Sequence, residues 1–200
     1  MTLDTALAGR RSVRQFDPRP VQPALLEEVI AAACLAPAPH HSRPWRFAIL
    51  SADARVTLTD AMGERWRQDL ERDNVPKARI RRLLNRSRAR LAAAPVLVLA
   101  GVVGDARRPW PDQHRQRAEE LMLVQSLGAA IQSLMLAAHA RGLGSCWLSA
   151  PLFCPEAVRL ALDLPPDFQP QALIALGYPK KGLRLPPRPP LTVRDHIIER

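Results

Sequence analysis

Residues 117–147 read RAEELMLVQSLGAAIQSLMLAAHARGLGSCW, and they contain the strongest indication of a core element in the sequence. Its part from Leu121 to Ala140 is the longest apolar segment of the chain. Polar side chains that would be costly against lipid interrupt it, namely Gln125, Ser126, Gln132, Ser133 and His139. The segment ends at Arg141-Gly142, a basic last turn followed by a glycine suited to a left-handed cap. The pattern predicts a central core helix over about residues 117–140 rather than a membrane span.

Apolar segments on either side of this helix predict the strands. Pro95–Val102, PVLVLAGV, has no polar alternation, which is typical of a strand covered on both faces. Trp45–Leu50 is bulky and suits a half-buried strand. Further strands are expected at residues 146–149 and 171–177, and helices at 22–36, at 52–94 with a break near Asn74, and at 155–162. Because these elements follow no regular βαβ period, the sequence predicts an α+β fold with a mainly antiparallel sheet.

The composition fits a single domain over residues 1–200. The chain is 47% hydrophobic, which is enough to form a core without metals or disulfides. Residues 1–8 form a lead without the apolar run of a signal peptide, so a cytoplasmic protein is expected. Residues 179–200 are rich in proline and predict an extended arm, of the kind that wraps a partner subunit. Cysteines of odd number without CxxC spacing predict buried free thiols at Cys34, Cys146 and Cys154.

Residues 10–14, RRSVR, predict a phosphate clamp. Guanidinium groups match phosphate oxygens in pairs, and a serine hydroxyl can donate to the same anion. The formal net charge of +10 likewise favours anionic partners. For this segment taken alone, a solvated basic N-terminus is the alternative. The residues concerned are Arg10, Arg11, Ser12, Val13 and Arg14.

Two loops next to predicted strands could approach a flat ligand. Residues 36–45, APAPHHSRPW, combine a backbone fixed by prolines with small side chains and two imidazoles. His40 and His41 have no Glu or Cys nearby at ligand spacing, so no metal site is expected. Residues 142–147, GLGSCW, offer backbone amides near Gly144 to the edge of a planar cofactor, although a simple helix stop is the stronger interpretation of these glycines alone. Neither GxGxxG nor GxxxxGK[ST] occurs, which leaves no sequence evidence for a Rossmann or P-loop site.

A basic segment over residues 65–90 carries nine arginines and one lysine. It fits three interpretations: a nucleic-acid interface, a solvated helical face, or a basic rim for an anionic substrate. Proteins that bind single strands interleave aromatic and basic residues, and this segment offers only Trp66. The basic rim therefore ranks above the nucleic-acid interface.

Taken together, three segments resemble the nitroreductase superfamily: RRSVRQF at residues 10–16, a proline-rich loop ending in Pro44-Trp45, and GLGSCW after the long apolar helix. A closer resemblance is to the C-terminal, nitroreductase-like domain of the bifunctional coenzyme F420 biosynthesis protein, which also carries a γ-glutamyl ligase. The segments that suggest it are residues 36–44, 65–70, 142–147, 162–165 and 177–178. The likeness covers about Gly9 to Pro190 and includes no ligase domain, so γ-glutamyl ligation is not expected.

This resemblance implies an α/β/α sandwich and an obligate homodimer, with exchanged C-terminal tails and two FMN sites at the interface. Residues 10–14 would hold the FMN phosphate and ribityl chain. The proline loop, from the other subunit, and the segment after the core helix would contact the ring through Pro37, Ala38, Pro39 and His41, and through Gly144, Ser149 and Ala150. A basic residue of the arm would reach the phosphate, with Arg184 the first choice and Arg188 the second. Expected substrate contacts are Ala38, Arg67 and Leu70.

The implied function is that of an FMN-dependent oxidoreductase with ping-pong hydride transfer through flavin N5 and no catalytic side chain. NAD(P)H or an F420-type deazaflavin would be the electron partner for a small-molecule substrate. His41 and Arg43 stand where most nitroreductases have Asn and Gln, so general nitro-compound specificity is not implied. Two alternatives stay open: a flavin- or F420-binding protein without turnover, and a basic nucleic-acid-binding module. The preferred interpretation includes no nucleic-acid or membrane partner.

Overall fold

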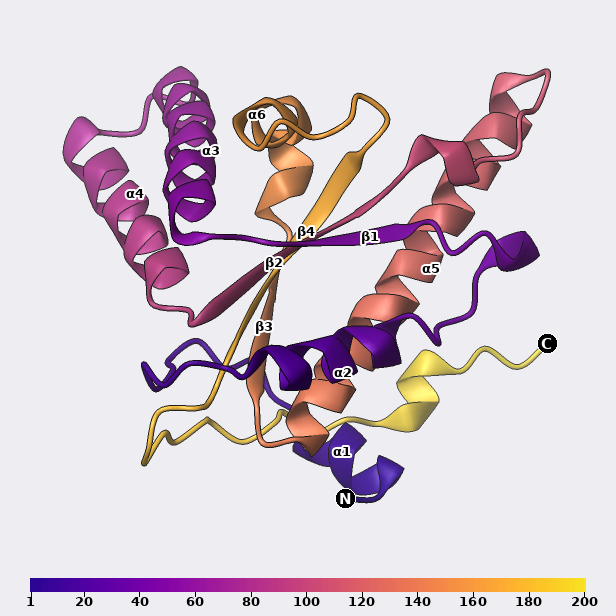
Figure 1. The fold of residues 1–200 in the computed structure, drawn as a ribbon, viewed down its shortest axis with the longest axis horizontal. Coiled ribbons are helices and arrows are strands. Elements are labelled where there is room, and N and C mark those ends of the chain that lie inside the picture. The colour runs from indigo at the N-terminus through magenta and orange to yellow at the C-terminus, as the bar shows by residue number, and fades with distance from the viewer.

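A four-stranded sheet lies at the centre of the computed structural model, which describes residues 1–200 (Figure 1). Its strands are β1 (Trp45–Ile49), β2 (Val96–Val102), β3 (Gly144–Leu148) and β4 (Gln169–Gly177). They lie in the order β1-β2-β4-β3, and all neighbouring pairs are antiparallel. The predicted α+β fold with a mainly antiparallel sheet is therefore confirmed.

Helices cover both faces of this sheet. On one face lie α2 (Pro23–Ala33) and α5 (Gln113–Ala140), and on the other lie α3 (Ala52–Arg72), α4 (Lys77–Ala92) and α6 (Pro155–Ala161) (Figure 1). Successive side chains of a strand point to opposite faces. In β2, Val98 and Ala100 pack toward α5, whereas Leu97 and Leu99 pack toward α3. This double burial explains why β2 has no polar alternation, and it confirms the predicted α/β/α sandwich.

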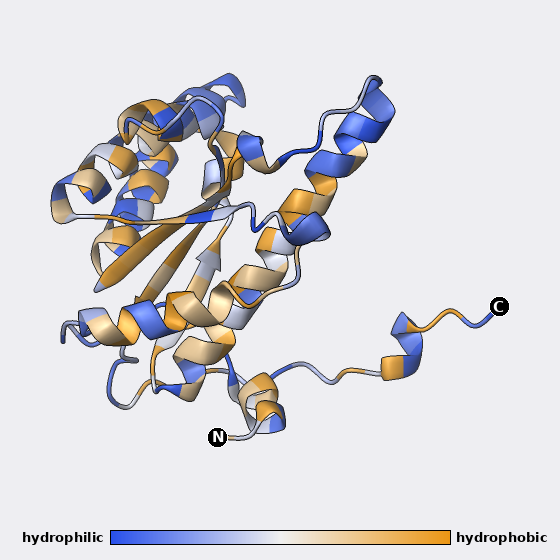
Figure 2. Ribbon diagram, turned by 45° about the vertical axis from the view of Figure 1, so that its right-hand side comes forward, coloured by the Kyte–Doolittle hydropathy of each residue, from blue (hydrophilic) through white to orange (hydrophobic).

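The core helix α5 is longer than its sequence pattern predicted. It begins at Gln113 rather than near Arg117, because Asp112 caps it by accepting a hydrogen bond from the Arg115 backbone N–H at 2.9 Å. It ends as predicted, with Gly142 in the left-handed region at φ 78°. By length and composition α5 could also cross a membrane, but 44% of its most apolar window is buried inside the protein. Its buried apolar residues belong to the larger core cluster, as expected for a core helix. Figure 2 shows that α5 is hydrophilic at its start and mostly apolar along the rest of its length.

The two ends of the chain meet beside the free edge of β3. The backbone N–H of Val13 donates to the carbonyl of Ser145 at 2.9 Å, so the segment after α1 (Leu3–Gly9) runs along this edge. The C-terminal arm then passes α1, and a guanidinium N–H of Arg11 donates to the carbonyl of Pro186 at 2.5 Å. Arg188 still contacts the body of the protein, and beyond it the arm extends away, as Figure 2 shows. Its residues from 184 onward are exposed.

Candidate functional site

A group of cations surrounds a small pocket where the arm meets the N-terminal segment. The pocket measures about 250 Å³, and Arg10, Arg11 and Lys180 line it. The guanidinium of Arg188 comes from the arm and donates to the carbonyls of Leu7, at 3.2 Å, and of Arg10. None of these cations forms an ion pair with a carboxylate in the structure. The pocket is therefore positively charged and open to an anion.

Arg10 carries an unsatisfied hydrogen-bond donor at this pocket. Its Nε is buried and has no hydrogen-bond acceptor. Burial, and after it the charge of Arg188, lowers the pKa of Arg10 from its ordinary value. A buried donor without a partner costs about 1–3 kcal/mol, and more when it is charged. An anion bound between Arg10 and Arg188 would satisfy the donor and relieve the repulsion between the two charges.

The expected cofactor residues 12–14 lie along the edge of β3, but not all of their side chains are free. Val13 is buried, and it covers the bare Cα of Gly144: a Cβ there would lie 2.7 Å from the Cβ of Val13. Gly144 is thus required because the N-terminal segment packs closely on it. Ser12 and Arg14 are exposed on either side of Val13. Any contact of Val13 or Gly144 with a ligand would therefore involve backbone rather than side-chain atoms.

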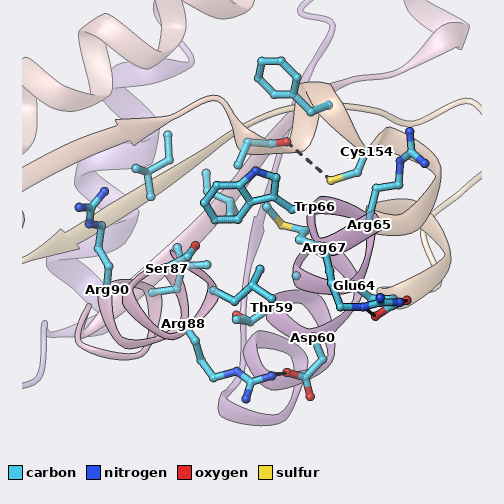
Figure 3. A pocket seen from close by; sticks show the side chains of 18 of the residues that line it. Thr59, Asp60, Glu64, Arg65, Trp66, Arg67, Ser87, Arg88, Arg90 and Cys154 are labelled. Carbon is cyan, nitrogen blue, oxygen red and sulfur yellow. Dashed lines mark hydrogen bonds and ion pairs between the residues drawn. The ribbon is translucent and has the colours of Figure 1, made fainter. Parts of the chain in front are cut away.

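A second and larger cavity, of about 900 Å³, opens at the other end of β3 (Figure 3). It lies between α3, α4 and the turn Ala150–Phe153, and the expected cofactor residues Ser149 and Ala150 line it. Of the expected substrate residues, Arg67 lines the cavity and Leu70 does not. The guanidinium of Arg67 is also engaged, because it donates to Glu64 at 2.5 Å and to Glu71 at 2.6 Å. Hydrogen bonds from Arg67, and after it from Gln68, lower the pKa of Glu64 to about 2.

The proline loop is strained and faces a different part of the protein. His40, His41 and Arg43 all have positive φ, at 52°, 55° and 45°. Such backbone conformations are costly for residues other than glycine and cluster at functional sites. The hydroxyl of Ser42 is buried without a hydrogen-bond partner. Strain and an unsatisfied hydroxyl in one loop support a binding role for it.

One chain does not bring this loop and the large cavity together. The loop precedes β1, and its residue Ala38 packs against the α2–α5 core, whereas the cavity lies among the helices that follow β1 (Figure 1). The family resemblance predicts that Pro37, Ala38, Pro39 and His41 share a site with residues 10–14 and 149–150. A single subunit does not bring these two sets of residues together.

The cysteines correct one expectation. Cys146 and Cys154 are buried free thiols as predicted, and burial raises the pKa of both. At Cys146 the nearby guanidinium groups of Arg14 and Arg90 oppose that rise. The expectation that Cys34 is also buried is wrong: it is exposed, because it follows the last turn of α2 instead of continuing its apolar face.

Sequence reasoning missed several residues that line these two spaces. Arg90, Trp66 and Phe153 line the cavity, and Lys180 and His139 line the anion pocket. In the sequence Arg90 is one of nine arginines in the basic segment, and nothing distinguishes it from the other eight. The sequence predicts His139 only as a polar interruption of the core helix. In the structure it lies in the last turn of α5, beside Gly9.

Known proteins share both the sequence pattern and the fold. A model of the nitroreductase family matches residues 7–178. The chain is 33% identical to the NADH dehydrogenase of Thermus thermophilus. This alignment of 186 residues covers 88% of this chain and 85% of the relative. It is 28% identical over 191 residues to the 5,6-dimethylbenzimidazole synthase of Rhodospirillum rubrum, with 92% and 85% covered. The solved FMN and NADPH-dependent nitroreductase NfnB from Sphigopyxis sp. strain HMH has the same fold, with a TM-score of 0.74 at 23% identity over 100% of this chain and 99% of the other.

Proposed function

The chain belongs to the nitroreductase family, as its three motifs predicted, and we propose that it is an FMN-dependent oxidoreductase with NAD(P)H as electron donor. The family match and the 33% identity to a protein named NADH dehydrogenase support the reaction class. The likeness to a nitroreductase named as FMN and NADPH-dependent supports the cofactor and the donor. The narrower resemblance to the F420-linked domain stays a prediction, and so does a deazaflavin partner.

The observation that carries this proposal is the unsatisfied Nε of Arg10 beside Arg188. A phosphate group carries the negative charge that neither guanidinium has as a partner, and it offers an acceptor oxygen to the Nε of Arg10. We assign the FMN phosphate to this pocket, with Arg11 and Lys180 as further cations. Arg188, the second choice from sequence, is favoured over Arg184 because its guanidinium already reaches the Arg10 carbonyl.

The rest of the cofactor would follow β3 from the pocket to the cavity. Gly144 at the start of β3 lines the pocket, and Ser149, just after its end, lines the cavity. Five strand residues at about 3.3 Å each bridge these two spaces. Ser12 and Arg14 lie beside this path and would bind the ribityl hydroxyls and the adjoining ring edge. Ser149 and Ala150 would then contact the ring.

We further propose a homodimer in which the proline loop of one subunit completes the site of the other. The loop and the cavity are separated within one chain, so a second copy must supply whichever of them is missing. The arm also exposes apolar side chains that a partner would cover: Leu191, Val193, Ile197 and Ile198. Exchange of the two arms would bury them at the interface.

When bound, FMN supplies the hydride chemistry, and the protein supplies binding, orientation and electrostatics. Arg10 and Arg188 would fix the phosphate end, and Arg14 would hold positive charge beside the ring. A cation at that position stabilises negative charge in an environment that excludes water. No side chain is required as an obligatory acid or base. Donor and acceptor would use the same ring face in turn, which gives ping-pong kinetics.

The test is a visible spectrum of the purified protein, before and after loading with FMN, followed by anaerobic addition of NADH, NADPH or reduced F420. We expect a yellow protein whose flavin bands bleach with NADH or NADPH. If the flavin bands bleach with reduced F420 but not with NADH or NADPH, the electron donor is a deazaflavin instead. A protein that cannot be loaded with FMN would contradict the proposal. Aerobic incubation with FMN and NADPH, analysed for 5,6-dimethylbenzimidazole, separates a reductase from the reaction of the Rhodospirillum relative.

A further inference from the structure

The cavity between α3 and α4 carries aromatic surface that the proposed phosphate site does not use. Trp66 from α3 lies in its centre (Figure 3) and is 38% exposed. Phe153, from the turn after β3, also lines it and is 78% exposed. Exposed indole and phenyl faces of this kind stack on planar ligands. The volume of about 900 Å³ lies within the range of small-molecule sites, roughly 300–1,000 Å³.

The charges around this cavity are neutralised with one exception. Asp60 pairs with Arg88 at 2.5 Å, Glu64 with Arg67 at 2.5 Å, and Asp69 with Arg65 at 3.1 Å. Arg90 is the remaining charged residue of the lining, and it has neither an ion pair nor a hydrogen bond in the structure. In Figure 3 its guanidinium stands apart from the paired groups. The cavity therefore offers a single uncompensated positive charge.

Arg90 also stands where the cavity meets the proposed path of the cofactor. It is half-buried, and its charge reaches the thiol of Cys146 on β3 together with that of Arg14. Leu148, two residues further along β3, lines the cavity. A half-buried guanidinium without a partner is costly. A ligand that carries one negative charge would remove this cost.

We propose that the cavity binds a planar aromatic monoanion, with its ring against Trp66 and its carboxylate on Arg90. This inference deepens the proposed function, since it names the substrate class of the same site, and it rests on that function only in calling the ligand a substrate. Arg90 acts as the specificity-determining residue, because the paired arginines of the lining have no free charge to offer.

The test is equilibrium binding of 2-naphthoate and of its neutral analogue 2-naphthamide to the FMN-loaded protein without electron donor, measured by calorimetry. Wild type is expected to bind the carboxylate more tightly than the amide. Arg90→Gln lowers carboxylate affinity by about 10-fold to 100-fold, the range for a lost charge-assisted hydrogen bond, and leaves amide affinity unchanged. Arg86→Gln is the matched control, because Arg86 is exposed on the same helix and does not line the cavity.

Trp66→Leu gives an independent check if Arg90→Gln does not fold. It should weaken both ligands by the same factor, because stacking does not depend on the carboxylate charge. Equal affinity for the two ligands in wild type would overturn the inference. So would an equal effect of the Arg86 and Arg90 substitutions, or a loss of FMN from Arg90→Gln, which would assign this arginine to the cofactor.

Failure of this inference and failure of the proposed function give different results. Reduction by NAD(P)H without binding of 2-naphthoate would support the proposed function and contradict the substrate class. Binding of 2-naphthoate through Arg90 without reduction by any donor would support the site and contradict the reductase assignment.

Discussion

The guanidinium of Arg188 donates a hydrogen bond to the backbone carbonyl of Arg10, although 177 residues separate the two positions in sequence. This contact joins the C-terminal arm to the segment after α1, and it holds two positive charges together. Because the Nε of Arg10 is buried without an acceptor, an anion bound nearby would stabilise this arrangement. The proposed phosphate site thus combines residues from both ends of the chain.

The first prediction concerns this pair of arginines. Arg188→Gln is expected to weaken FMN binding by about 10-fold to 100-fold, through loss of a charge-assisted contact to the phosphate. Arg184→Gln removes the same charge from an exposed residue of the arm with no hydrogen bond in the structure, and it should have little effect. The measurement is the dissociation constant of FMN from quenching of flavin fluorescence. A larger loss of FMN affinity from Arg184→Gln than from Arg188→Gln would assign the phosphate contact to Arg184 instead.

A second prediction concerns Arg14, which reaches toward Cys146 between the pocket and the cavity. Arg14→Ala should lower FMN affinity by a similar factor, about 10-fold to 100-fold, because a cation beside the ring edge is lost. Arg14 is exposed, so the melting temperature of the apoprotein should stay close to that of wild type. Unchanged FMN affinity would remove Arg14 from the site.

A third prediction separates packing from ligand binding at Gly144. Gly144→Ala would put a Cβ 2.7 Å from the Cβ of buried Val13, and overpacking of this kind costs about 1–3 kcal/mol. Gly63→Ala is the matched control: no heavy atom lies within 4 Å of its added Cβ, and it sits inside α3. That change should raise stability by about 0.5–1 kcal/mol. Chemical denaturation of the two apoproteins measures both effects, and equal stabilities would contradict the packing argument.

A fourth prediction follows from the carboxylate network on α3. Hydrogen bonds from Arg67 lower the pKa of Glu64 to about 2 in the folded protein. Its contribution to stability is therefore present above the ordinary pKa of glutamate and is lost as the pH falls toward 2. Near neutral pH the melting temperature of wild type should be higher than that of Glu64→Gln. This difference should disappear as the solution is acidified. Because Glu64 is exposed, high salt should shrink the difference at every pH.

The fold was predictable from sequence where one residue pattern has one physical solution. The apolar run of β2 needs cover on both faces, and the polar-interrupted α5 must lie in a core. The site was predictable only as a set of residue types. Nine arginines in one segment look alike until their neighbours are known. Arg88 is exposed and pairs with Asp60, whereas Arg90 is half-buried and has no carboxylate within reach. In the same way, the choice between Arg184 and Arg188 depends on the path of an arm whose prolines predict extension but not direction.

The last prediction tests whether two subunits build each site. Arg10→Ala should remove the phosphate contact, and His41→Glu should bring a negative charge against the ring from the strained proline loop. Each variant alone is expected to be inactive as a homodimer. If the loop of one subunit completes the site of its partner, unfolding and refolding the two variants together gives mixed dimers with one intact site. Random pairing makes half of the dimers mixed, so activity should return to about a quarter of wild type. If both residues instead serve the site within their own chain, every site in the mixture carries a defect and no activity returns.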